Sequence, residues 1–553
     1  MKKLFPYILF FFIYVSIVAK AQSNNESNVL EKKIFSVESL KRHLSFLGSD
    51  LFEGRGLGST GESLASKYLA LELNMLGVKP IGDNGTYYQH IPFHSNIPLR
   101  ESDLKLIIND TIHKLNYLDD YVLLKTGPQT FIPSLTEMVF VGYGITAPEY
   151  DYNDYQYIDA DGKIVVMLGG EPQSDDTVFF DGPAPTVYSY YESKIRTALS
   201  HGARGSIIIP TPLDYYYSDW EKIKKNYSFE DISLAYTPAG NFAVLINPNL
   251  SKILFDNSDF SFENIMSMHF ENKMKSFPLK LKMTFNGKFK RRDFISSNVV
   301  GIIEGSDPEL KNTYLIISAH YDHLGIGTPV KGDSIYNGVL DNAMGTSGVL
   351  ELAKAISLMD KAPKRSIIFM FVTGEEEGAL GSSYYTDHPL VPLFKTVADV
   401  NVDGLAFIDN FKSVVCAGCE LSELGNILKK TLKSHNLFET SIPPEFRQYE
   451  SYNFSDQISF AKAGVPAVLI MDGPDYVHIS REEGINRLID YSQNYYHSPF
   501  DDLSQKINYN ASVQHLEFLL SFCLNIANSD VEPQWYKDSP FINARLRSRA
   551  ERK

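Results

Sequence analysis

The stretch "SIIFMFVTGEEEGALGSSYY" at residues 366–385 decides the fold of the second half of the chain. Its apolar run from Ile367 to Val372 is typical of a strand buried inside a sheet, and three glutamates, Glu375 to Glu377, follow closely. A carboxylate at the end of a buried strand is costly unless a cation or hydrogen-bond donors compensate its charge. The stretch therefore predicts a strand that delivers acidic side chains to a functional site.

Short apolar runs of the same kind recur through this half of the chain, with helical patterns between several of them. They are "NVVGIIEG" (298–305), "YLIISAH" (314–320), "VADVNVD" (397–403), "SVVCAG" (413–418) and "AVLIMDG" (467–473). Strands that alternate with helices predict an α/β domain over residues 296–528, with a mostly parallel, doubly wound sheet flanked by helices. In such sheets ligands bind beyond the carboxyl ends of the strands, which is where the glutamates lie.

Length and charge limit the classes of protein that fit. A chain of 553 residues, 44% of them hydrophobic, is too long for one ordinary core, so we expect two or more domains. The formal net charge at pH 7 is −15. Because binding to nucleic acid normally requires a basic surface, this charge argues against a nucleic-acid partner.

The N-terminus has the pattern of an export signal. Lys2 and Lys3 precede an apolar run from Leu4 to Val18, and Ala19-Lys20-Ala21 matches a cleavage site. We interpret residues 1–21 as a signal peptide that sends the protein to the periplasm or the medium, in preference to an uncleaved anchor. No later segment is long and apolar enough to predict a membrane span, so none is expected after cleavage.

The cysteine content excludes a disulfide-built scaffold, since the chain has only Cys416, Cys419 and Cys523. "CAGC" at 416–419 reads as the end of a strand. We interpret these residues as structural thiols or one incidental disulfide, in preference to half of a zinc ribbon or a redox pair.

The rest of the chain divides into segments that differ in residue composition and hydrophobic pattern. Residues 34–130 are expected to form the N-terminal part of the catalytic region, and residues 137–290 a smaller, β-rich inserted module. Residues 529–553 are expected to form a C-terminal tail, and its basic end "ARLRSRAERK" at 544–553 is interpreted as solvated. The tyrosine-rich segment "LDYYYSDWEKIKKNYSFED" at 213–231 is interpreted as a solvated loop, with a substrate lid as the alternative.

Histidines and carboxylates gather just after the apolar runs. They are His320, Asp322, His323, Asp341, Glu375 to Glu377 and Asp403, with His497 further on in "YYHSPFDD". A single such residue is most simply a helix cap or a solvated turn residue. Together they can give each of two metal ions nitrogen and oxygen ligands, with one carboxylate bridging; the ligand types favour zinc, with manganese or cobalt as alternatives.

The motifs that carry these residues resemble the M28 family of zinc peptidases, whose aminopeptidases use two zinc ions. They are "SAHYDHLG" (318–325), "YNGVLDNAMGTSGVLELA" (336–353), the opening stretch, "ADVNVDG" (398–404), "FSDQISFAKAGVPAVLI" (454–470) and "YYHSPFDD" (495–502). Residues 137–290 resemble a protease-associated domain, through "DGKIVVML" and "KIRTALSHGARGSIII". The resemblance implies a zinc-peptidase fold with this domain inserted.

The resemblance also implies a role for each site residue. One zinc ion would be held by His320 and Asp403 and the other by Glu376 and His497, with Asp341 bridging the two and Glu375 as general base to the shared water. Asp322 would orient the ring of His320. Tyr496, or its neighbour Tyr495, would donate a hydrogen bond to the carbonyl oxygen of the substrate.

Other residues are less constrained by the resemblance. His323 is interpreted as a loop side chain, although contact with metal or substrate stays open, and Glu377 as solvated. Asp501 or Asp502 is expected to partner His497. Gln457 stands where relatives commonly have histidine, and Gly338-Val339-Leu340 stands where small or acidic residues are usual.

The resemblance implies a secreted or periplasmic zinc aminopeptidase that acts on peptides with a free N-terminus. The alternatives are another two-zinc hydrolase, a glutaminyl cyclase-like enzyme, or a non-catalytic receptor-like binding protein. Retention of all five expected ligands and the base favours a catalyst over a receptor. The sequence sets neither the preferred N-terminal residue nor the oligomeric state.

Overall fold

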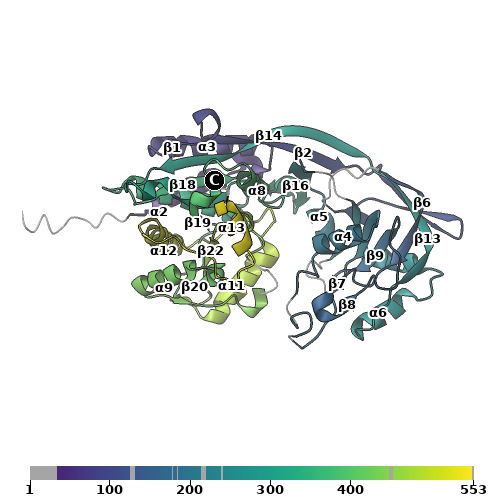
Figure 1. The fold of residues 1–553 in the computed structure, drawn as a ribbon. Coiled ribbons are helices and arrows are strands. Elements are labelled where there is room, and N and C mark those ends of the chain that lie inside the picture. Colours follow the sequence, from purple (N-terminus) through teal and green to yellow (C-terminus); the bar gives the residue numbers. More distant parts are fainter. Residues whose placement is uncertain are drawn as a thin grey trace, which may run out of the picture.

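The computed structural model describes residues 34–550, except 125–130, 177, 183–184, 213–218, 238–240 and 447–451. The expected signal peptide at 1–21 lies outside the described residues. Two lobes, each built on one β-sheet, are joined by an arch of two long strands (Figure 1). We call the lobe with the ten-stranded sheet the first lobe, and the lobe with the eight-stranded sheet the second lobe.

Parallel strands form the centre of the first sheet, and antiparallel strands flank them. In spatial order the path is β11 (Asp231–Leu234), β2 (Tyr88–Pro98), β14 (Phe289–Ile303), β18 (Ser366–Val372), β15 (Tyr314–His320), β19 (Thr396–Asn401), β22 (Ala467–Asp472), β20 (Ser413–Ala417) and β21 (Phe438–Glu439), with β1 (Lys79–Pro80) paired to β14. The run from β18 to β22 is parallel. The predicted α/β class is confirmed, with its parallel strands in the middle of the sheet.

Strand β18 shows why these apolar runs form buried strands. Its residues alternate between two cores: Ile367, Phe369 and Phe371 face one, and Ile368, Met370 and Val372 face the other. The first core is covered by α2 (Val37–Leu47), α3 (Thr60–Met75), α7 (Met344–Ser357), α9 (Leu424–His435) and α12 (Tyr509–Ala527). Helices α8 (Leu380–Asp387) and α10 (Gln457–Lys462) contribute to the second. Helix α11 (Arg481–Asn494) leads to the loop before α12.

The second sheet has the order β4 (Thr111–Leu115), β3 (Asp103–Ile108), β13 (Phe277–Asn286), β6 (Phe131–Phe140), β9 (Ile164–Leu168), β10 (Gly205–Ile209), β12 (Phe242–Ile246) and β5 (Tyr121–Leu123). Its helices are α4 (Tyr191–Ser200), α5 (Trp220–Asn226) and α6 (Phe262–Phe270). Two hairpins, β7 (Thr146–Ala147) with β8 (Tyr152–Asn153) and β16 (Gly325–Val330) with β17 (Asp333–Tyr336), stand apart.

Two segments differ from the sequence-based expectation. Strands β3 to β5 lie within 34–130, expected in the catalytic region, yet they pair in the second sheet because Leu104, Leu106 and Ile108 face its core. The described part of 213–231, expected as a solvated loop, forms α5 and leads into β11, which pairs with β2 of the first sheet. Long-range pairing, which no local pattern reveals, decides both cases.

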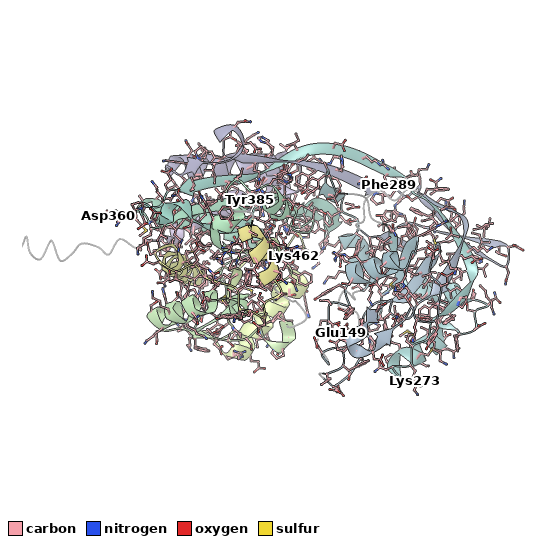
Figure 2. All side chains as sticks on the ribbon, viewed as in Figure 1. Glu149, Lys273, Phe289, Asp360, Tyr385 and Lys462 are labelled. Atoms are coloured by element: carbon pink, nitrogen blue, oxygen red, sulfur yellow. A yellow bond between two sulfur atoms is a disulfide. The ribbon has the colours of Figure 1, made fainter. Side chains whose placement is uncertain are left out.

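The arch is the antiparallel pair β2 and β14, in register from Phe289 opposite Pro98 to Val299 opposite Tyr88. Phe289 lies where β14 meets the second lobe and packs against its core (Figure 2). The other end of β14 pairs with β18 in the first sheet. One strand therefore belongs to the framework of both lobes.

The C-terminal segment packs against the first lobe, and this includes Arg545 of the basic end that was expected to be solvated. The indole N–H of Trp535 donates to the carbonyl of Gly464 at 2.9 Å. In α13 (Ile542–Ala550) the guanidinium of Arg545 donates to the carbonyl of Leu393 at 3.0 Å, and Arg545 is buried. The apolar surface of Trp535, which joins Ile458 in a small core, holds this segment against the first lobe.

Cys416 and Cys419 form a disulfide at the end of β20, and Cys523 is a buried free thiol in α12. This agrees with the interpretation of one incidental disulfide. None of the helices in the described part of the chain has the length and apolar character needed to cross a bilayer.

One buried histidine predicts how stability depends on pH. His515 in α12 is buried, its Nδ1 accepts a hydrogen bond from the main chain of Ala406 at 3.1 Å, and burial lowers its pKa to about 4. The unfolded chain, with a histidine pKa of about 6.5, binds more protons between about pH 6.5 and 4. His515 should therefore cost roughly 3 kcal/mol of unfolding free energy as the pH falls through that window.

His515→Asn keeps a hydrogen-bond acceptor and removes the titration. Urea unfolding of the metal-free protein at pH 7.5 and pH 4.5 should show a smaller acid-induced loss in this variant than in wild type. His478→Asn, at a mostly exposed histidine, is the matched control. Equal losses in wild type and His515→Asn would contradict the prediction.

Candidate metal centre

The acidic and histidine side chains meet where the central parallel strands end. His320 is the last residue of β15, Glu375 and Glu376 follow β18, and Asp403 follows β19. Asp341 lies in an irregular helical turn, Val339–Ala343, directly before α7. His497 comes from the loop between α11 and α12. Neighbouring parallel strands end at one edge of the sheet, so residues far apart in sequence become neighbours.

Two groups of ligand atoms share the carboxylate of Asp341. Nε2 of His320 lies 3.4 Å from Oδ1 of Asp341 and 3.3 Å from Oδ1 of Asp403. Nε2 of His497 lies 3.3 Å from Oδ2 of Asp341 and 3.1 Å from Oε2 of Glu376. Each oxygen of Asp341 thus faces a different histidine, as a bridging carboxylate requires.

These separations fit metal coordination. Ligand atoms about 2.0–2.1 Å from a tetrahedral zinc ion are about 3.3 Å apart. The four separations lie between 3.1 and 3.4 Å, and three of them exceed the usual N–H···O hydrogen-bond range of about 2.7–3.2 Å. Nitrogen and carboxylate oxygen are also the ligand types that zinc accepts. The residues present therefore fit two zinc ions.

The electrostatics of the cluster favour a bound cation. Burial opposes protonation of His497, but the carboxylates of Glu376 and Asp341 outweigh it and raise its pKa to about 10. Burial likewise opposes protonation of His320, and the nearby carboxylates of Asp403 and Glu375 raise its pKa well above its ordinary value. In metal-free protein, protons on the histidines offset the negative charge; metal ions would displace them.

Glu375 differs electrostatically from its neighbour. Its carboxylate lies within 4.8 Å of ligand atoms of His320 and Glu376. Burial, reinforced by the charge of Glu376, raises the pKa of Glu375 well above its ordinary value, whereas the facing histidines lower the pKa of Glu376 despite burial. The two adjacent glutamates therefore differ: Glu376 is held ionised, whereas Glu375 has an increased affinity for a proton.

Asp322 and Tyr496 lie next to the cluster. Nδ1 of His320 is 3.3 Å from the main-chain oxygen of Asp322 and 3.8 Å from its carboxylate, which also accepts the main-chain N–H of Glu375 at 3.3 Å. Asp322 thus links the loops after β15 and β18. The ring of Tyr496 stacks on His497 with centroids 3.8 Å apart, and 46% of Tyr496 is exposed, which places it at the rim.

His323, interpreted from the sequence as a loop side chain, lies inside the cluster. It is buried, and its Nδ1 is 2.5 Å from Oε1 of Glu376 and 4.0 Å from Oδ2 of Asp341. Since Oε2 of Glu376 faces His497, His323 engages the other oxygen. The turn that brings His323 inward is fixed by its main-chain N–H, which donates to the carbonyl of Arg55 at 3.2 Å. Only the closeness of His323 to the His320 motif could have suggested its role.

Arg55 is the residue that sequence reasoning missed most completely. Its guanidinium is fully buried and donates to four main-chain carbonyls: Tyr321 (2.7 Å), Leu47 (3.0 Å), Asn337 (2.6 Å) and Gly338 (2.8 Å). Tyr321 lies between His320 and Asp322, and Gly338 lies three residues before Asp341. Arg55 therefore ties together the loops that carry the ligands. Burial lowers its pKa to about 10, so it stays charged at neutral pH.

Asp501 and Asp502, the alternative partners expected for His497, make other contacts instead. Asp501 accepts hydrogen bonds from the main chain of Leu340 and Asp341 at 3.0 and 3.1 Å and from the hydroxyl of Tyr491 at 3.2 Å, so it positions the turn that holds Asp341. Asp502 bonds Ser504. Within the described part of the chain, neither carboxylate forms a hydrogen bond or ion pair with the ring of His497.

Gln457 is fully buried behind β19. Its amide oxygen accepts from Asn401 at 2.9 Å, and its amide nitrogen donates to the carbonyl of Tyr452 at 2.9 Å. Both ends of the amide are therefore engaged inside the lobe, and no surface of the side chain is left to face a substrate.

Comparison with known proteins agrees with this geometry. Residues 298–523 match the family model described as Peptidase family M28. Aminopeptidase NAALADL1 of Mus musculus is 34% identical over 136 residues, which are 23% of this chain and 16% of that protein. Leupeptin-inactivating enzyme 1 of Streptomyces exfoliatus is 26% identical over 180 residues, 32% of this chain and 36% of that protein. The chain thus matches well under half the length of these relatives.

A solved structure shares the fold across both lobes. An aminopeptidase from Aneurinibacillus sp. strain AM-1 superposes with a TM-score of 0.53 at 18% sequence identity, covering 89% of this chain and 94% of that one. A zinc aminopeptidase from Bacillus subtilis gives a TM-score of 0.47 at 17% identity, covering 90% and 96%. At these identities the first likeness establishes the fold alone.

Removing Arg55 should cost both stability and metal affinity. Arg55→Met leaves four buried carbonyls without their donor, which we expect to lower the free energy of unfolding by about 3–5 kcal/mol. Arg365→Met, at a buried arginine that bonds Thr313 and Ser529 in the same lobe, is the control. Urea unfolding and zinc titration of both variants should show comparable destabilisation, with weakened zinc binding only in Arg55→Met. Wild-type zinc affinity in Arg55→Met would contradict the assignment.

His323 should matter for metal binding although it was not expected to. His323→Leu frees Oε1 of Glu376, and loss of such an outer partner typically weakens metal affinity 10–100-fold. We expect a loss of that size for one of the two zinc ions, measured by competition with a chelator. His478→Leu removes a histidine paired with Asp409 away from the cluster and should change neither affinity. Unchanged binding of both ions in His323→Leu would show that Glu376 needs no such support.

Proposed function

We propose that the protein is a metallopeptidase, and more specifically an aminopeptidase with two zinc ions, because residues 298–523 match the model of peptidase family M28. One observation carries the proposal: Oδ1 of Asp341 faces His320, whereas Oδ2 of Asp341 faces His497. His320 and Asp403 would hold one zinc ion, and Glu376 and His497 the other. Zinc is favoured by the donor set, although manganese and cobalt accept the same ligands.

The residues around the metals have distinct tasks in this proposal. Zinc, when bound, would acidify a water molecule and polarise the scissile carbonyl. Glu375 accepts the proton of the attacking water and returns it to the leaving amine, a role that suits a half-buried carboxylate with a raised pKa. Asp322 holds the loops of His320 and Glu375 in register.

Tyr496 is proposed to stabilise the reacting carbonyl. It stands at the rim and stacks on His497, so its hydroxyl can reach a substrate that enters from solvent. A hydrogen bond that the hydroxyl donates to the developing oxyanion becomes stronger as the negative charge develops, and only an interaction that is stronger in the transition state accelerates the chemical step. Tyr495 is the alternative donor in the same loop.

A free amino terminus on the substrate is proposed from the names of similar proteins. NAALADL1 of Mus musculus and the Aneurinibacillus protein both carry the name aminopeptidase. A glutaminyl cyclase-like enzyme, another two-zinc hydrolase and a receptor-like protein remain the competing functions, and the metal count and the reaction separate them.

Export and the identity of the second lobe are also part of the proposal. We infer that the second lobe is the protease-associated-like insertion, and that the chain acts in the periplasm or the medium. The disulfide between Cys416 and Cys419 supports export, since such bonds persist mainly in oxidising compartments.

The test is hydrolysis of free-amino and N-acetylated aminoacyl chromogenic amides by wild type and Glu375→Gln, with metal analysis of both. We expect turnover of the free-amino amides only, about two zinc ions in each protein, and at least a 100-fold loss of turnover in Glu375→Gln. Glu377→Gln is the matched control. Two bound metals without hydrolysis of any amide would exclude the aminopeptidase, and a chain that binds no metal would be receptor-like.

A further inference from the structure

We infer that Lys225 of the second lobe is a positioning residue for the proposed second metal site, acting through the main chain of His497. The inference rests on the proposed function for the role of His497. Its basis is a contact between the lobes: Nζ of Lys225 donates to the main-chain oxygen of His497 at 2.9 Å. A cation from one lobe thus reaches the backbone of a metal-binding residue in the other.

His497 needs outside support more than the other expected ligands. His320, Glu376 and Asp403 lie at or just after strands that are buried in the sheet, whereas His497 lies in the loop between α11 and α12. Its backbone is also in the left-handed region, with φ at 53°, which is uncommon for a residue other than glycine. Such a conformation persists only where surrounding contacts hold it.

Lys225 is itself firmly placed. Its helix is anchored to the second lobe, because Ile223 is buried in a core of that lobe and the indole N–H of Trp220 donates to the carbonyl of Leu118 at 3.0 Å. The ammonium of Lys225 lies 4.9 Å from the ring centroid of Tyr336, within the range of a cation–π contact. Tyr336 belongs to β17, which connects to the turn that carries Asp341.

The chain after Lys225 is anchored to the first lobe. Phe229 packs edge-on against Tyr336 with centroids 5.3 Å apart, and Glu230 pairs with Arg292 of the arch. Strand β11 then adds to β2. The segment from α5 to β11 is therefore fixed at both ends, and Lys225 stands between the two anchors. The segment is a clamp on the His497 loop rather than the solvated loop expected from the sequence.

The experiment compares Lys225→Met, Lys225→Arg and Lys222→Met. Lys222 is an exposed lysine of the same helix and is the matched control. The first readout is stepwise zinc affinity from competition with a chelator. The second is amide hydrogen exchange of residues 491–503 in metal-free protein, which depends neither on zinc nor on activity.

We expect Lys225→Met to bind one zinc ion like wild type and the other 10–100-fold more weakly, with faster exchange in residues 491–503. Lys225→Arg, which keeps the cation, should recover most of both properties, and Lys222→Met should resemble wild type. A general loss of structure would lower the urea midpoint and affect both zinc ions, so equal weakening of both would overturn the inference.

The outcomes separate this inference from the proposed function. Wild-type zinc affinities and wild-type exchange in Lys225→Met would overturn the role of Lys225 and leave the aminopeptidase intact. If wild-type protein binds no zinc and hydrolyses no amide, the proposed function fails. In that case the exchange of residues 491–503 in Lys225→Met still tests the clamp. Exchange as slow as in wild type rejects the clamp, and faster exchange than in wild type supports Lys225 as a contact that holds the loop.

Discussion

The arrangement of the candidate metal centre depends on one buried guanidinium. The carboxylates of the centre and its surroundings repel one another, and the loops that carry them come from distant parts of the chain. Arg55 supplies both a positive charge and donors for four carbonyls in these loops. Because its partners are main-chain atoms, it constrains where the backbone runs and leaves the carboxylates themselves available to bind cations.

The remaining charge is balanced by groups that a metal ion would displace. In the metal-free centre, His320 and His497 hold protons because carboxylates face them. Zinc requires the same histidines in their neutral form, so metal binding releases protons. His323 is placed differently, since it contacts the oxygen of Glu376 that points away from His497. The centre thus combines residues that face the metal positions with residues that orient them.

The sequence was sufficient for what local patterns encode. Apolar runs such as Ile367–Val372 gave buried strands, and the carboxylates and histidines placed after those runs do come together at one edge of the sheet. What the sequence did not reveal depends on contacts between distant segments. The sequence around Arg55 gives no indication that its guanidinium bonds four main-chain carbonyls. The sequences of strands β3 to β5 likewise do not indicate which sheet these strands join. The inward turn of His323 has the same kind of cause.

The antiparallel pairing of β2 and β14 has a consequence for the order of folding during synthesis. About 190 residues separate the two strands, so at about 5–20 residues per second β14 is made roughly 10–40 s after β2. All strands of the second sheet are complete by then, while no parallel strand of the first sheet exists. The second lobe can therefore fold first on the ribosome. During that interval β2 is a nascent strand with open edges, and β11, made well before β14, is the available partner that can cover one of them.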